Sequence, residues 1–177
     1  RASFKVADGY EVNLFASETD GVAKPIQLRF DPEGRMYVAC SRVYPQLEPG
    51  KEADDRIYRL DDTNGDGRAD RSTVFARGLL IPTGIEVGDG GVYVGNATEL
   101  LHLKDTNGDG EADERRVVLR GFGTGDAHQN INSFSWGPGG ELMFSQGLHA
   151  FSNVETPWGT ERLHEAGIWR LRPRRLR

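Results

Sequence analysis

Short runs of alternating apolar and polar residues recur along the chain and predict β-strands rather than helices. The clearest runs form three hairpins with glycine-rich turns, at residues 28–39, 85–95 and 134–145. A further short strand is expected before each hairpin, at residues 12–16, 72–76 and 116–120, and another after each hairpin, at residues 57–60, 100–103 and 168–171. The pattern therefore predicts an all-β fold.

The predicted strands also repeat as a unit. Four short strands in every 45 to 60 residues or so, repeated in series, are typical of the blades of a β-propeller. The 177 residues hold about three such units, whereas propellers close with about four to eight blades. We therefore interpret residues 1–177 as one partial propeller domain, the N-terminal half of a longer propeller with up-and-down, four-stranded antiparallel blades. A β-sandwich is the alternative, but it does not require an internal repeat.

Two stretches of ten residues, 61–70 and 104–113, have nearly the same sequence, DDTNGDGRAD and KDTNGDGEAD. Each has oxygen-bearing side chains at loop positions 1, 3, 5 and 9 and a glycine at position 6, a pattern that suits a hard cation such as calcium. The candidate metal ligands are Asp62, Asn64, Asp66, Asp70, Asp105, Asn107, Asp109 and Asp113. Position 12 holds Thr73 or Arg116 instead of the glutamate of an EF-hand. Because strands flank both loops, we expect the ions to be structural; a turn without an ion is the alternative.

Composition excludes several classes of protein. The net charge of −5 argues against a nucleic-acid surface. The single cysteine, Cys40, excludes an internal disulfide and a haem-attachment motif. No apolar run approaches the roughly 20 residues that cross a bilayer, so no membrane span is expected in this chain. The motifs of serine hydrolases, P-loop proteins, zinc proteases and dinucleotide-binding enzymes are missing from the sequence.

Residues 121–130 are the segment richest in groups that can do chemistry. His128 is a candidate catalytic base, and Asp126 could orient its imidazole or raise its basicity. An equally weighted alternative is a histidine that bonds a backbone carbonyl at the surface or between blades. Propeller topology places further polar residues on the same face as His128, and we expect these to line a cofactor or substrate: Arg42, Asn96, Asn132, Gln146 and His149.

The segment from His128 to Gly147 resembles the soluble glucose and aldose sugar dehydrogenases, which are six-bladed propellers that use pyrroloquinoline quinone (PQQ) and calcium. In that family the catalytic base is a histidine followed by glutamine, as in His128 and Gln129. The resemblance implies that His128 takes the hydroxyl proton while hydride passes to the quinone. The hairpin turn at residues 137–140 reads Gly-Pro-Gly-Gly, where those enzymes have Gly-Pro-Asp.

Essentially the whole chain is similar to the membrane-bound dehydrogenase domain of planctomycete and verrucomicrobial bacteria. The matching segments are residues 9–12, 24–27, 31–39, both acidic loops, 121–124 and 154–159. The resemblance implies an exported protein, periplasmic, secreted or in the cell envelope, whose propeller is often followed by a c-type cytochrome module that could accept electrons.

Together these patterns favour the calcium-binding propeller of a PQQ-dependent dehydrogenase whose substrate is a sugar or another alcohol. The competing hypothesis is a non-catalytic propeller, stabilised by calcium, that binds carbohydrate or a protein partner, because folds of this kind host both functions.

Overall fold

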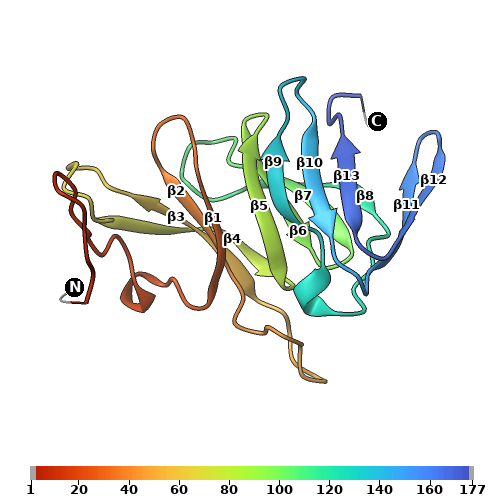
Figure 1. Cartoon of the computed structure of the whole chain (residues 1–177), viewed down its shortest axis with the longest axis horizontal. Coiled ribbons are helices and arrows are strands. Elements are labelled where there is room, and N and C mark those ends of the chain that lie inside the picture. The colour runs from red at the N-terminus through yellow and green to blue at the C-terminus, as the bar shows by residue number, and fades with distance from the viewer. Residues whose placement is uncertain (1–2, 176–177) are drawn as a thin grey trace.

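The computed structural model describes residues 3–175, and over this range the chain is almost entirely β-structure (Figure 1). Two short 3-10 turns, η1 (Glu18–Asp20) and η2 (Ala127–Gln129), are the helical elements of the described range. No helix among these residues is long and apolar enough to cross a membrane. The fold prediction is therefore confirmed at the level of an all-β chain.

The strands form antiparallel sheets that follow one another in chain order. The first sheet contains β1 (Pro25–Phe30), β2 (Met36–Cys40), β3 (Asp55–Asp61) and β4 (Arg71–Leu79). The second repeats this order with β5 (Pro82–Gly88), β6 (Gly91–Asn96), β7 (Glu99–Lys104) and β8 (Glu114–Arg120). The third contains β9 (Asn132–Trp136), β10 (Leu142–Gln146) and β13 (Gly167–Leu171). A separate hairpin, β11 (Phe151–Thr156) and β12 (Gly159–His164), is inserted between β10 and β13.

The three predicted hairpins are confirmed as β1–β2, β5–β6 and β9–β10. Segments 72–76 and 116–120 are strands too, paired with β3 and β7 as the fourth strands of the first two sheets. The predicted strand at residues 12–16 is wrong, because this segment makes no ladder. It lies instead along the first acidic loop, where the Phe15 carbonyl accepts a hydrogen bond from the Ala69 amide at 2.9 Å.

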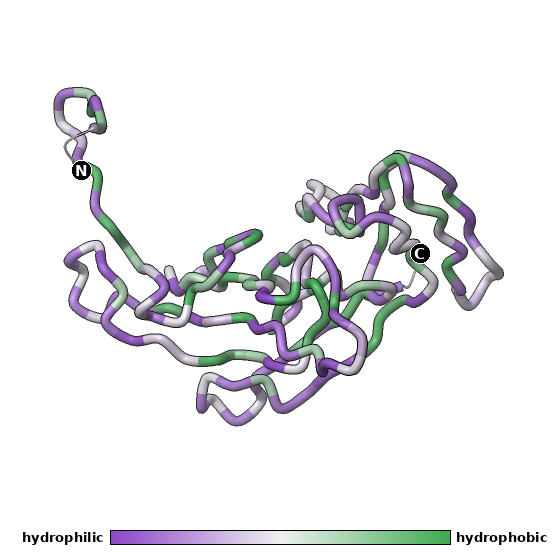
Figure 2. Tube along the Cα trace, turned by 90° about the horizontal axis from the view of Figure 1, so that it is seen from below, coloured by the Kyte–Doolittle hydropathy of each residue, from purple (hydrophilic) through white to green (hydrophobic). Residues whose placement is uncertain are grey.

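Hydrophobic and hydrophilic residues alternate in short stretches along the trace (Figure 2), which gives each sheet two apolar faces. The first and second sheets enclose one core, formed by Tyr37, Ala39, Ile57, Phe75, Leu79, Ile85, Val92, Val94, Leu101 and Leu103. The second and third sheets enclose another, which includes Tyr93, Leu100, Leu119, Phe134, Leu142, Phe144 and Leu171. Adjacent residues on β6, such as Tyr93 and Val94, thus serve different cores.

The first strands of the three sheets, β1, β5 and β9, lie side by side (Figure 1). Arg29 on β1 reaches both neighbours: its Nε lies 2.9 Å from Glu86 Oε2 on β5, and its Nη2 donates to the Phe134 carbonyl on β9 at 2.8 Å. The Ile85 amide on β5 donates to Gln27 Oε1 on β1 at 2.6 Å. Because these bonds join different sheets, they fix how far apart the sheets stand.

Antiparallel alternation sorts the connections onto two ends of the sheets. The hairpin turns and the two acidic loops, between β3 and β4 and between β7 and β8, lie at one end, here named the turn face. Residues 41–54, 121–131 and 147–150 lie at the other, here named the groove face (Figure 1). The sequence had placed the candidate base and the acidic loops on opposite faces, and the strand order agrees.

Candidate functional site

The Asp126–His128 pair is formed by a single turn of helix. Asp126 is the N-cap of η2, and its Oδ1 accepts the His128 backbone N–H at 2.9 Å. The same oxygen lies 2.8 Å from Nδ1 of the His128 ring. The His128 backbone N–H and then its side chain lower the pKa of Asp126, so the carboxyl group stays ionised. With Nδ1–H donating to this carboxylate, Nε2 is left with a lone pair that can accept a proton.

The imidazole opens onto a groove on the groove face. The His128 side chain is 65% exposed, and the Tyr44 ring meets it edge-on with the ring centroids 5.1 Å apart. The groove has a volume of about 560 Å³, within the range of roughly 300–1,000 Å³ that is usual for small-molecule sites. Besides His128, it is lined by the polar residues Lys24, Gln27, Ser41, Tyr44, Thr83 and Asn132.

Each of the three first strands begins at this groove. Lys24 immediately precedes β1, Thr83 is the second residue of β5, and Asn132 is the first residue of β9. Lys24 has a φ of 49° and Ser133 a φ of 55°, a left-handed conformation that is uncommon for residues other than glycine. Backbone of this kind persists where surrounding contacts impose it, and it concentrates at binding sites.

A buried carboxylate that the sequence reasoning missed anchors the loop that carries Tyr44. Asp55 is 1% exposed. Its Oδ1 accepts the Arg42 amide at 2.6 Å, and its Oδ2 accepts the Ser41 hydroxyl at 2.5 Å and the Ile81 amide at 3.0 Å. Asp55 follows Asp54, which is exposed, so the sequence gave no signal to separate them.

Gln129 ties the turn that carries His128 to the loop after β10. Its backbone carbonyl accepts the Gly147 amide at 3.0 Å, and its side-chain Oε1 accepts the His149 amide at 2.5 Å. The side chain of His149 is exposed, and it is not among the residues that line the groove. The position of η2 is therefore fixed from both sides, by Asp126 and by Gln129.

Of the five residues expected to line a cofactor or substrate, the structure brings Asn132 to the groove. Arg42 is exposed and contributes its backbone carbonyl, which accepts a hydrogen bond from Lys24 Nζ at 3.1 Å. Asn96 is buried, and its Oδ1 accepts the Leu80 amide at 2.7 Å. Asn96 is thus held in the second sheet and does not line the groove.

Gln146 does not reach the groove either, because the protein uses its side chain internally. It is 3% exposed. Its Nε2 contacts three backbone carbonyls, and its Oε1 accepts from the Ser152 hydroxyl at 2.7 Å and from Trp169 Nε1 at 2.9 Å. Gln146 therefore joins the β11–β12 hairpin to the third sheet.

The two acidic loops fold almost identically. In the first, Asp62 accepts the amides of Gly65 and Gly67, both at 2.8 Å. In the second, Asp105 accepts those of Gly108 and Gly110, at 2.6 and 2.8 Å. The remaining candidate ligands Asn64, Asp66, Asp70, Asn107, Asp109 and Asp113 likewise accept hydrogen bonds from their own loops.

The donor chemistry of these loops suits calcium, but the arrangement does not gather it. Within residues 3–175, no three His, Cys, Asp or Glu side chains converge to hold a metal ion. Loop N–H groups occupy carboxylate oxygens that a calcium ion would need, since it takes about six to eight oxygen ligands. The loops fit the ion in residue type and spacing but not in this conformation.

The fold and the site define a class of protein: serial antiparallel sheets whose first strands meet at a groove beside a His–Asp pair. The family model described as "Domain of unknown function (DUF7133)" matches residues 1–177, and the chain belongs to this family. No curated protein matches the sequence.

Two solved structures are similar to this chain in fold. They are the iodide structure and the calcium structure of the Trichoderma reesei Carbohydrate-Active Enzymes Family AA12, each with a TM-score of 0.56 and 17% sequence identity. The alignments cover 80% of this chain and 34% and 33% of the solved chains, so this chain spans about a third of the length of the structures that it matches. At this identity the similarity concerns the fold alone.

Proposed function

We propose that this chain supplies part of a β-propeller in a PQQ-dependent dehydrogenase that oxidises a sugar or another alcohol. Its sheets would be the first blades, and the third sheet would be completed by a further strand. Serial four-stranded antiparallel sheets support the propeller. The similarity of fold to a family of carbohydrate-active enzymes supports a sugar as the substrate class.

The observation that carries the proposal is the Asp126–His128 pair at the edge of the groove. An alcohol bound there would give its hydroxyl proton to Nε2 of His128. The resulting imidazolium is stabilised by the ionised Asp126, which accepts the Nδ1–H in both protonation states. Tyr44 limits the rotation of the ring by packing against its edge.

The quinone, when bound, would accept the hydride from the carbinol carbon. PQQ is a planar group rich in carboxylates and carbonyls, and the groove offers a cation at Lys24, hydroxyls at Ser41 and Thr83, and the Asn132 amide. These groups fit such a ligand chemically. The Lys24 ammonium would pair with a carboxylate, and the hydroxyls and amide would orient carbonyl oxygens.

The acidic loops would have a structural role in this protein. We propose that each binds calcium after its carboxylates turn from loop N–H groups to the ion, which would stiffen the turn face. An exported location and a c-type cytochrome as electron acceptor are parts of the same proposal, and they rest on the resemblance of the sequence to exported dehydrogenases.

The test uses the full-length protein that contains this chain. PQQ is titrated by absorbance with calcium present, and dye reduction is followed over a panel of sugars and alcohols. His128→Ala should lower kcat by about 10²- to 10⁴-fold, the usual contribution of a general base, with little effect on quinone affinity. His149→Ala is the matched control, because His149 is exposed nearby but does not line the groove.

Three outcomes separate the hypotheses. Turnover that collapses in His128→Ala and persists in His149→Ala supports the proposal. Turnover that survives in both variants removes His128 from the reaction. A folded protein that neither binds quinone nor reduces dye, but binds a sugar or a protein partner, would identify a binding propeller instead.

A further inference from the structure

The two acidic loops have the same internal structure but different neighbours. Each docks on the preceding part of the chain through its eighth position: the Ala69 amide donates to the Phe15 carbonyl at 2.9 Å, and the Ala112 amide donates to the Phe75 carbonyl at 2.7 Å. Beside this shared bond, the glycine at position 6 faces a different side chain in each loop. Any difference between the two loops in binding cations therefore has a source outside their common motif.

At the first loop, the neighbour of the position-6 glycine is a neutral amide. Asn13 Nδ2 donates to the Gly67 carbonyl at 3.1 Å. A Cβ built on Gly67 would lie 3.3 Å from the same nitrogen. The amide supports the loop backbone and adds no charge.

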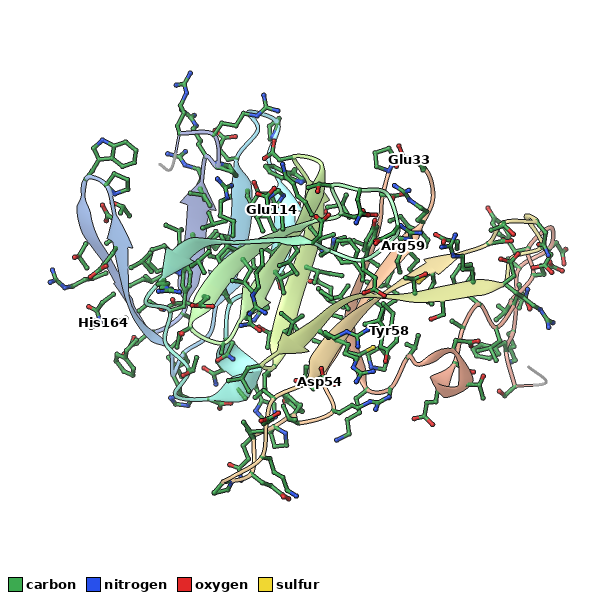
Figure 3. All side chains as sticks on the ribbon, turned by 180° about the vertical axis from the view of Figure 1, so that it is seen from behind. Glu33, Asp54, Tyr58, Arg59, Glu114 and His164 are labelled. Carbon is green, nitrogen blue, oxygen red and sulfur yellow. The ribbon has the colours of Figure 1, made fainter. Side chains whose placement is uncertain are left out.

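At the second loop, the neighbour is a guanidinium. A Cβ built on Gly110 would lie 2.9 Å from Arg59 Nη2, so the glycine leaves room for the arginine to lie against the loop backbone. Arg59 Nη1 is 3.9 Å from Asp105 Oδ2, at the first ligand position of the loop. Figure 3 shows Arg59 on β3, at the junction of the first sheet with this loop.

The charge on Arg59 is poorly neutralised. Its side chain is 9% exposed, and its Nε has no hydrogen-bond partner among the described residues. Asp61 Oδ2 lies 3.4 Å from Nη2, a long contact, while Asp61 Oδ1 is itself buried and without a partner in this part of the chain. A buried ion pair with unused donors and acceptors is an arrangement that a change of partners can relieve.

We propose that Arg59 is the resident counter-ion of the second acidic loop and that calcium binding there displaces the guanidinium from Asp105. This inference rests on the proposed binding of calcium by the loops. The ion and the guanidinium compete for the same carboxylate, so the affinity of the second loop is set by a residue of the neighbouring sheet. Calcium binding at this loop would consequently change the contact between the first and second sheets.

Exposed charges around the loop do not remove this effect. Glu111 and Glu114 add negative charge near the second loop, but both are exposed, and solvent and salt screen their fields. Arg59 is buried and its charge is screened less. Even in bulk water, a unit positive charge about 6 Å from a divalent cation weakens its binding roughly tenfold.

The test measures calcium binding to the full-length protein by equilibrium titration. The second loop's contribution is identified as the binding step that Asp105→Asn removes, and the first loop's as the step that Asp62→Asn removes. In Arg59→Met the second-loop step should tighten at least about tenfold, and the first-loop step should stay within about twofold. Arg59→Lys keeps the charge and should stay closer to the parent than Arg59→Met does.

Asp61→Asn gives a second, opposite variant that does not depend on removing Arg59. It takes away the carboxylate that partly neutralises the guanidinium, so the second-loop step should weaken. An unchanged second-loop affinity in both Arg59→Met and Asp61→Asn overturns the inference while leaving calcium binding intact. If neither loop binds calcium in the parent or in any variant, the proposed calcium role fails, and this inference fails with it.

Discussion

Replacing Gly84 by alanine tests the close approach of the second and third sheets. A methyl group at this position would overlap the ring of Phe134 and come within 3.1 Å of the Asn132 Cα, which is backbone and cannot move alone. Phe134 is fully buried and stacks on Phe144 with the ring centroids 5.0 Å apart. The ring therefore has no free space to turn into.

The expected cost follows from two opposing effects. Forcing an extra methyl group into a packed core costs about 1–3 kcal/mol. Gly84 does not have a positive φ, so alanine fits its backbone, and the loss of freedom in the unfolded chain returns about 0.4–1 kcal/mol. We expect a net loss of about 1–2 kcal/mol in the free energy of unfolding.

Denaturant unfolding of the full-length protein, followed by tryptophan fluorescence, measures this loss. Gly137→Ala is the matched control, because Gly137 also lacks a positive φ and its Cβ would approach only the Glu141 side chain, at 3.4 Å, and atoms farther away. The control should be unchanged or more stable by up to about 1 kcal/mol.

A second substitution shows whether the cost arises from the Phe134 ring. Combining Gly84→Ala with Phe134→Leu should recover part of the loss, with a coupling energy of about 0.5–3 kcal/mol, because the smaller side chain leaves room for the methyl group. If Gly84→Ala is as stable as Gly137→Ala and shows no coupling to residue 134, the two sheets are not packed as closely as described.

Two further predictions concern titratable groups buried in the sheets. Burial lowers the pKa of His102, whose Nε2–H donates to the Gly88 carbonyl at 3.0 Å. The unfolded chain thus takes up this proton first, so stability is full above the ordinary value of 6.5 and falls at lower pH by up to about 1.4 kcal/mol per unit. His102→Gln should flatten this fall in denaturant titrations from pH 7 to 5; an unaltered fall would contradict the assignment. Burial also raises the pKa of Cys40 to about 11, so at pH 8 its alkylation in the native protein should be roughly a hundredfold slower than in denaturant, and rapid native labelling would mean that residues 15–22 do not cover it.

The sequence predicted the regular parts of this fold because two short-range signals coincide there. Alternating apolar residues and glycine-rich turns mark β1–β2, β5–β6 and β9–β10. It failed at residues 12–16, which alternate like a strand but bond to an acidic loop. It also missed the β11–β12 hairpin, whose alternation is mostly polar and whose anchor is the side chain of Gln146. Both errors arise from contacts between distant parts of the chain.

The candidate site divides in the same way. The Asp126–His128 contact is local, two residues apart, and was predicted from the sequence. The groove beside it was not predicted in detail, because Lys24, Thr83 and Asn132 are brought together by the packing of three sheets. Polar residue type alone could not distinguish Asn132, which lines the groove, from Asn96, which the second sheet uses internally.

The repeat and the chemistry of this chain are carried by different segments. The same strand positions recur in each sheet, and the recurrence brings the starts of β1, β5 and β9 to one groove. The reactive pair, however, comes from residues 121–131, a connection longer than the two residues between β4 and β5. The groove's width thus depends on sheet spacing, whereas its base depends on one inserted turn. A substitution such as Gly84→Ala should therefore disturb ligand affinity through the groove without altering the Asp126–His128 hydrogen bond, and His128→Ala should do the reverse.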